Sequence, residues 1–276
     1  MFQKTVYVSL ALFILAALFA ALPAGAQSIF LEPNTGPSLH LEALRPSVGS
    51  LDFSFFSYSF YLSGRIRAGE TTQLRFEVPY ASYKLEDSIF TATGRSSFGN
   101  PYVGAEFGPR DRGVQGEVGI RLPVMSDNAE AAGFGLLADP VERMEAYLDD
   151  ILPVYAGLSY RHRSAGGFAM MLRAVPVAWI YTGDGSADSE LFVLHSAQAW
   201  YEAEKVALGA GLSGRFLVTG DGADLGERTL YELGFFANFD LGTFRPGLQV
   251  RFPLDADLTD DLRLDPWYSI SLGLEL

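Results

Sequence analysis

VQGEVGIRL, residues 114–122, alternates strictly between two kinds of side chain. Val114, Val118 and Ile120 fall on one side of an extended chain, whereas Glu117 and Arg121 fall on the other. Successive side chains of a β-strand point to opposite faces of the sheet. The stretch therefore predicts a strand with one apolar face and one charged face.

The same alternation recurs along the chain in segments of about ten residues, separated by Gly, Asp, Asn, Ser or Pro. Strands of this length are longer than the five or six residues usual in soluble sheets, and they match a tilted crossing of a bilayer core. The expected strands lie near residues 38–44, 52–63, 73–78, 101–108, 114–122, 154–161, 167–180, 190–202, 206–219, 231–239, 248–254 and 268–276.

The connections alternate between short and long. Outer-membrane barrels have short periplasmic turns and longer outer loops, and a sheet in lipid must close because every backbone group needs a partner. We therefore predict an all-β fold, a closed antiparallel transmembrane barrel of about twelve strands, over a soluble sandwich. The short connections lie near 64–71, 108–113, 163–167, 203–205 and 240–243, and the long ones near 80–100, 124–151, 182–189, 220–228 and 255–266.

Residues 1–26 have the features of a cleaved signal peptide. Lys4 provides a positive start, residues 6–22 form an uncharged apolar run, and Ala24-Gly25-Ala26 is a small-residue cleavage site. The expected barrel is then the single domain of residues 27–276. The alternative is a retained helix that anchors the chain in a membrane.

The composition narrows the function classes. The 276-residue chain has no cysteine, which excludes disulfides, thiolate metal sites and a lipid-modified cysteine. Its net charge of -13 argues against nucleic acid as a partner. No cofactor or metal is expected, because the carboxylates of Asp255, Asp257, Asp260 and Asp261 favour a solvated acidic face over a Ca²⁺ site.

Two stretches carry a family resemblance. The C-terminal strand YSISLGLEL, residues 268–276, looks like the last strand of bacterial outer-membrane β-barrel proteins, although these usually end in Phe or Trp and not in Leu276. FGNPYVGAEF, residues 98–107, leading into GIRLP, residues 119–123, resembles transporter barrels of the phenol-degradation meta-pathway type. The resemblance implies location in the cell outer membrane of a Gram-negative bacterium, and it carries over no catalytic residues.

The loop of residues 124–150 is expected to contain a short helix. Asp139 would be its N-cap, Pro140 its first residue and Glu142 the partner in a capping box. The helix would either cover the barrel mouth as a lid or decorate the surface. The excess of acidic residues in this loop and in residues 255–265 is expected outside the cell, whereas the short turns hold arginines.

Charged residues on the polar faces are the candidate functional residues. In an open pore they would select solutes by charge, and in a plugged one they would pair across the interior. The predicted pore-lining residues are Arg75, Glu77, Glu106, Glu117, Arg121, Arg161, Arg173, Arg215, Glu232, Arg245, Arg251 and Glu275.

The sequence thus predicts an outer-membrane barrel that lets a small solute pass, hydrophobic solutes included, in a porin-like or transporter-like way. The expected partners are outer-membrane lipid, lipopolysaccharide, the barrel insertion machinery and the solute. The alternative is a non-conducting structural or adhesion barrel with acidic surface loops.

A weaker alternative is a lipid hydrolase with a His/Ser pair on the barrel wall. On a strand the two residues must be two positions apart to share a face. His195 and Ser196 are adjacent, and His162 and Ser164 fall at a turn. No Gly-x-Ser-x-Gly motif occurs. We therefore expect no enzymatic activity and assign no catalytic residues.

Overall fold

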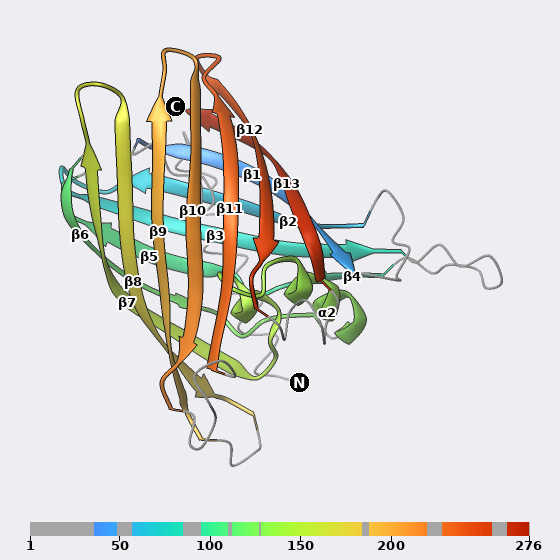
Figure 1. Cartoon of the computed structure of the whole chain (residues 1–276). Helices are drawn as coiled ribbons and strands as arrows, with labels where there is room; N and C mark the ends of the chain where they lie inside the picture. The colour runs from blue at the N-terminus through green and yellow to red at the C-terminus, as the bar shows by residue number, and fades with distance from the viewer. Residues whose placement is uncertain are drawn as a thin grey trace.

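The computed structural model describes residues 36–48, 57–84, 95–109, 112–126, 128–183, 188–219, 228–255 and 264–275. Its strands are arranged in one antiparallel sheet (Figure 1). They are β1 (Ser38–Val48), β2 (Tyr58–Arg67), β3 (Thr72–Tyr83), β4 (Arg95–Phe98), β5 (Tyr102–Phe107), β6 (Gly113–Arg121), β7 (Ile151–Arg163), β8 (Phe168–Tyr181), β9 (Glu190–Glu202), β10 (Val206–Leu217), β11 (Thr229–Phe239), β12 (Phe244–Pro253) and β13 (Leu264–Glu275).

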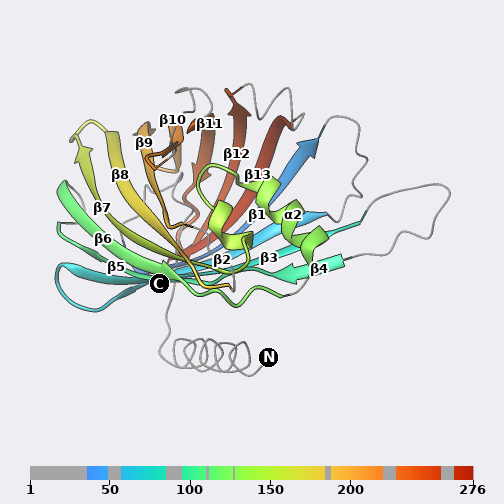
Figure 2. The same cartoon turned by 90° about the horizontal axis from the view of Figure 1, so that it is seen from below.

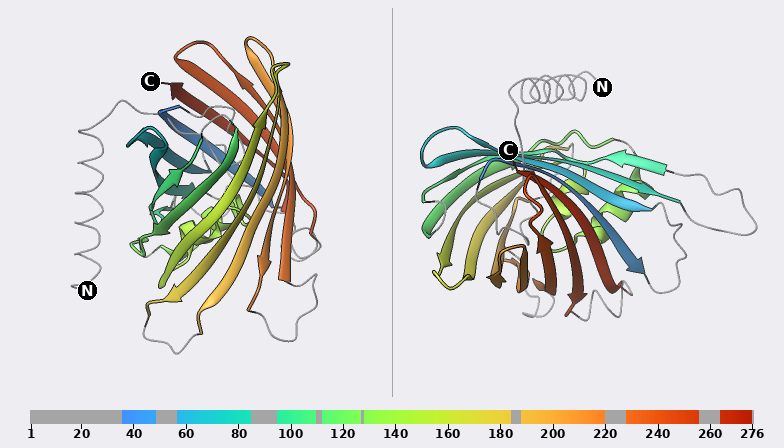
Figure 3. Two further views of the ribbon diagram at one scale, coloured as in Figure 1. Left: turned by 90° about the vertical axis from the view of Figure 1, so that its left-hand side faces the viewer. Right: turned by 90° about the horizontal axis from the view of Figure 1, so that it is seen from above.

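From β5 to β13 consecutive strands pair with one another, as do β2 and β3, and the two ends of the sheet meet. β1 pairs with β13 from Ser38↔Glu275 to Val48↔Leu264, and β1 also lies beside β2. β4 and β5 both pair with β3, one after the other, so they share one strand position. The result is a closed barrel of twelve strands, as predicted. The strands from β7 to β12 form one continuous curved wall (Figure 3).

The two faces of the wall differ as the alternation predicted. In β6, Val114 is 58% exposed and Val118 46%, whereas Glu117 and Arg121 are buried. The outward positions of the other strands repeat this pattern. They carry exposed apolar side chains around the barrel, among them Leu41, Leu74, Leu158, Leu172, Leu208, Phe235, Leu248 and Ile270. Apolar residues outside and polar residues inside are the arrangement of a barrel in lipid.

The long connection between β6 and β7 folds into the barrel. It contains α2 (Ala129–Ala138) and the 3₁₀ turn η1 (Met144–Tyr147). Phe134 and Ala138 pack against Leu44 of β1 and Tyr61 of β2. Figure 2 shows α2 on the concave side of the strands. We call residues 128–148 the plug. The expectation of a surface decoration was wrong, because the apolar side of α2 is buried against the wall.

The predicted helix boundary was also wrong. α2 ends before Asp139, which is its C-cap, and Asn128 is its N-cap through a 3.1 Å bond from Ala131 N. Asp139 precedes Pro140, and the residue before a proline is disfavoured in the helical conformation, so the helix ends there. Asp139 nevertheless caps the next turn, because its Oδ1 accepts the backbone N–H of Glu142 at 3.0 Å.

Two of the predictions concern residues outside the described ranges. One is the signal peptide, residues 1–26. The other is the acidic cluster, of which three members lie outside these ranges: Asp257, Asp260 and Asp261. In the described part of the chain no helix is long and apolar enough to cross a membrane. The same residues contain no group of three or more His, Asp or Glu suited to a metal ion.

Candidate functional site: the charged lumen and its plug

Eleven of the twelve predicted pore-lining residues have side chains on the inner face of the wall. Arg75, Glu106 and Arg245 are partly buried. The side chain of Glu275 lies outside the described residues. The remaining eight are buried: Glu77, Glu117, Arg121, Arg161, Arg173, Arg215, Glu232 and Arg251.

Many of these charges pair along the wall. Arg75 of β3 meets Glu106 of β5 at 2.7 Å. Two further pairs, both 2.6 Å long, join Arg121 of β6 to Glu77 of β3 and Arg173 of β8 to Glu117 of β6. A buried charge is tolerated only when it is paired and hydrogen-bonded, so these contacts explain how the lumen holds so many ions. Arg161 lies over the ring of Trp200, 5.2 Å from its centroid.

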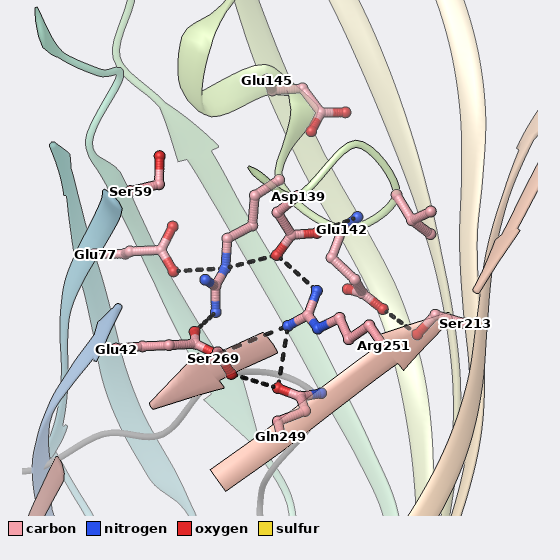
Figure 4. A network of polar contacts seen from close by, with 12 residues as sticks. Glu42, Ser59, Glu77, Asp139, Glu142, Glu145, Ser213, Gln249, Arg251 and Ser269 are labelled. Atoms are coloured by element: carbon pink, nitrogen blue, oxygen red, sulfur yellow. Dashed lines mark hydrogen bonds and ion pairs between the residues drawn. The ribbon is translucent and has the colours of Figure 1, made fainter. Parts of the chain in front are cut away.

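The plug adds charged residues that the sequence predicts outside the cell. Asp139 meets Arg251 of β12 at 3.1 Å (Figure 4). Arg143 meets Glu42 of β1 at 2.7 Å and Glu77 of β3 at 3.2 Å. All these side chains are nearly or completely buried. Asp139, an acid of the long loop, therefore pairs with a cation inside the barrel and does not face solvent.

The second half of the plug contacts the opposite wall. Glu142 accepts a 2.8 Å hydrogen bond from Ser213 Oγ and lies 3.5 Å from Arg173. Glu145 pairs with Arg215 of β10 at 2.8 Å and accepts a 2.9 Å bond from Trp179 Nε1. The plug is therefore tied by charge to both sides of the barrel.

Electrostatics fixes the charge of Glu145. Burial alone would raise the pKa of this carboxyl, but the Arg215 guanidinium and the bond from Trp179 hold the pKa below its ordinary value of 4.5. The group stays ionised at neutral pH, and its attraction to Arg215 is available to hold the plug in place.

Asp139, Glu142, Arg143 and Glu145 were missed as site residues, although the sequence carried two signals. Arginines outnumber glutamates among the predicted inward residues, so the wall alone has unmatched cations. The segment AEAAGFGLLA, residues 129–138, is also too apolar for a solvated loop. Among the described acids of this connection, those that face solvent are Glu130, Asp149 and Asp150.

The histidines do not form the pair that a barrel hydrolase would need. His40 is buried on the inner face of β1. His162 is exposed on the outer face of β7, and the Oγ of Ser164 accepts the N–H of Phe168 in the adjoining turn. His195 packs edge-on against Tyr231. Among the described residues, no histidine hydrogen-bonds a serine.

The barrel, its apolar exterior and its charged interior define a class: the chain is a bacterial outer-membrane β-barrel, located in the cell outer membrane. No family model and no curated protein matches its sequence. Solved structures share the fold at low sequence identity. An outer membrane channel from Pseudomonas putida F1 matches with a TM-score of 0.60 at 12% identity, over 91% of this chain and 99% of that one.

Two further structures have the same architecture. The NanC porin matches with a TM-score of 0.54 at 11% identity, over 86% of this chain and all of that one (100%). LpxR from Salmonella typhimurium matches with a TM-score of 0.50 at 11% identity, over 87% of this chain and 100% of that one. Proteins this distant establish a shared fold, and function has to be argued from the site.

Proposed function

We propose that this barrel is a gated outer-membrane channel for small solutes, with the plug as its gate. The observation that carries the proposal is that one internal segment, tied to the wall by ion pairs, occupies a lumen lined with charges of both signs. The predicted pore-lining residues then face the solute path and select by charge once the plug has moved. The similar folds of the channel and the porin described above support this reading.

The nature of the plug contacts favours a gate over a permanent filling. Replacing a buried ion pair by apolar residues of similar volume is often neutral or stabilising, so ion pairs are a poor way to fix a segment permanently. An ion pair needs both charges, however, so it breaks when either charge is neutralised or when another ion binds to one of the partners. A segment held in this way can be in place or displaced, and a charged solute or a proton can shift the equilibrium between these two states.

The charged lumen also bears on the solute. Polar and charged side chains along the inner face favour water-soluble solutes over the hydrophobic ones that the sequence left in consideration. Lipopolysaccharide around the outer loops and the insertion machinery during assembly are the further partners we propose.

Planar-bilayer conductance tests the proposal. A variant in which a short Gly-Ser linker replaces residues 128–148 should conduct continuously, whereas the intact protein should open in brief steps. The shift in electrophoretic mobility on heating shows that both are folded. If the folded variant without the plug gives no steps above background, the chain is a non-conducting structural barrel. Hydrolysis of a labelled phospholipid by the intact protein would instead point to the enzyme alternative.

A further inference from the structure

Figure 1 shows the plug away from the end of the barrel at which short turns join β7 to β8, β9 to β10 and β11 to β12. A second feature of the molecule lies at that end. Here the barrel contains a cavity of about 140 Å³. Its polar lining comes from strands that are distant in sequence: Arg163 at the end of β7, Glu202 at the end of β9, Asn238 and Asp240 at the end of β11, and Arg245 on β12.

The charges around the cavity form two pairs. Arg163 meets Glu202, and Arg245 meets Asp240 at 3.1 Å. Glu202 is further fixed by a 2.7 Å hydrogen bond from Trp200 Nε1. The cavity therefore presents two cations and two anions, and its formal charge is balanced.

Asn238 provides an independent sign that the cavity takes a ligand. Its side chain lines the cavity and is only 5% exposed, yet neither its Oδ1 nor its Nδ2 has a hydrogen-bond partner among the described residues. Buried polar atoms in folded proteins are nearly always hydrogen-bonded to something. A carboxamide held in this way offers one acceptor and two donors to a guest.

The space next to Asn238 is kept open by Gly247 of β12. A Cβ atom at this position would collide with Asn238 Oδ1 and Ser271 Oγ. Ser271 is 3% exposed, and its hydroxyl likewise has no hydrogen-bond partner within the described part of the chain. The glycine thus lets two unsatisfied polar groups converge beside the cavity.

We propose that this cavity binds a small zwitterion of the size and chemistry of a short α-amino acid. A cavity of roughly 150 Å³ accommodates benzene, so the guest has about six to eight non-hydrogen atoms, which is less than a monosaccharide. A simple anion would be attracted by the arginines but repelled by Glu202 and Asp240. A simple cation would be attracted by these acids but repelled by the arginines. A molecule with a carboxylate and an ammonium group satisfies both pairs, and the carboxamide of Asn238 bonds either end.

The proposal does not depend on conductance, because binding is measured on the folded, closed barrel. Calorimetric titration of the full mature chain in detergent with L-serine should show saturable heat. Lactate, ethanolamine and glycerol have similar sizes but a single charge or none, and they should bind at least tenfold more weakly. Changed Trp emission on serine binding, through Trp200 beside Glu202, supports binding in this cavity.

Variants locate the site. Asn238→Leu keeps the volume but removes both polar groups, and should weaken serine binding at least tenfold. Thr182→Val likewise exchanges a polar for an apolar side chain of similar volume, but at an exposed residue just after β8, at the opposite end of the barrel, and should leave serine binding unchanged. Asp240→Asn removes one anion, so it should weaken serine binding and strengthen lactate binding.

Three results would overturn the proposal: no serine heat at millimolar concentration, equal affinity for glycerol, or an unchanged affinity in folded Asn238→Leu. Heat-shifted electrophoretic mobility establishes that each variant is folded. A channel that conducts but does not bind serine would contradict this site alone, whereas serine binding without conductance would contradict only the gated channel.

Discussion

Arg251 on β12 and Asp139 in the plug form a 3.1 Å ion pair between two side chains that are both fully buried. Arg251 also lies 3.2 Å from Glu232 and 3.7 Å from Glu42. Glu42 in turn pairs with Arg143 of the plug at 2.7 Å. The two arginines therefore share carboxylates, and the wall and the plug belong to one charge network (Figure 4). Removing the charge of one residue in this network therefore changes the interaction energies of the others.

Neutralising Asp139 should release the plug. Asp139→Asn keeps an oxygen for the Glu142 N–H but removes the charge that faces Arg251, and breaking a buried pair costs about 3–5 kcal/mol. We expect longer open times in bilayers. Trypsin should also cut after Arg143, which is 1% exposed in the folded protein.

Asp149→Asn is the matched control, because it makes the same change at an exposed acid of the same connection. It should behave like the unaltered protein in both assays. Equal trypsin resistance of Asp139→Asn and Asp149→Asn would show that the pair does not hold the plug.

Acid should weaken the plug through Glu145. The pKa of this group is held below 4.5 in the folded state, so its stabilising effect is fully present above that value and is lost as the pH falls through the lowered pKa. The groups facing Glu145 are Arg215 and Trp179, with Arg121 and Tyr155 nearby.

Single-channel recordings at a series of pH values below about 4.5 should therefore show rising open probability. Glu145→Gln should be more open at neutral pH and should respond less to acid. Glu130→Gln, at an exposed acid of α2, is its control and should keep the full acid response. An identical acid response in Glu145→Gln would assign the effect to other groups.

Two glycines of α2 should respond in opposite ways to the same substitution. A Cβ at Gly135 would lie 2.6 Å from three ring atoms of the buried Tyr147, whereas a Cβ at Gly133 would meet nothing within 4 Å. Gly133→Ala should stabilise the helix by about 0.5–1 kcal/mol, because alanine has the better helix propensity. Gly135→Ala should separate α2 from η1 and expose the plug to trypsin.

Limited proteolysis of the two variants at several temperatures checks this. Greater trypsin sensitivity of Gly133→Ala than of Gly135→Ala would contradict the packing described for the plug.

The outward position of Leu158 provides a test of the membrane assignment. This residue of β7 is 61% exposed, and Arg on the lipid face of a barrel costs about 2–4 kcal/mol near the bilayer midplane. Leu158→Arg should lower the free energy of unfolding by that amount in lipid vesicles titrated with guanidinium, and Leu158→Phe should change it little. A loss within about 0.5 kcal/mol for Leu158→Arg would be the behaviour of a surface residue in water.

The alternation could be predicted because lipid and lumen impose opposite demands on neighbouring residues such as Ile120 and Arg121. The contacts of the plug could not be predicted in this way. Arg143 and Glu42 are 101 residues apart, and no local pattern specifies which wall residue a loop residue meets. An acid in a loop has the same sequence signature whether it faces water, as Asp149 does, or an arginine in the interior, as Asp139 does.

The start of the plug can be tethered to test whether the segment moves. Ser97 of β4 and Ser126, two residues before the plug, have their hydroxyl oxygens 2.8 Å apart. The chain has no cysteine, so a Ser97→Cys/Ser126→Cys pair can form only the intended bridge within one molecule. The short separation of the two side chains suits disulfide geometry.

If the plug leaves its place as a unit, the oxidised double variant should lose the conductance steps, and dithiothreitol should restore them. Each single variant should conduct like the unaltered protein under both conditions, which controls for the substitutions themselves. Steps that persist in the fully oxidised protein would mean that solute passes without displacement of the segment that follows Ser126, and the gate would then have to lie elsewhere in the lumen.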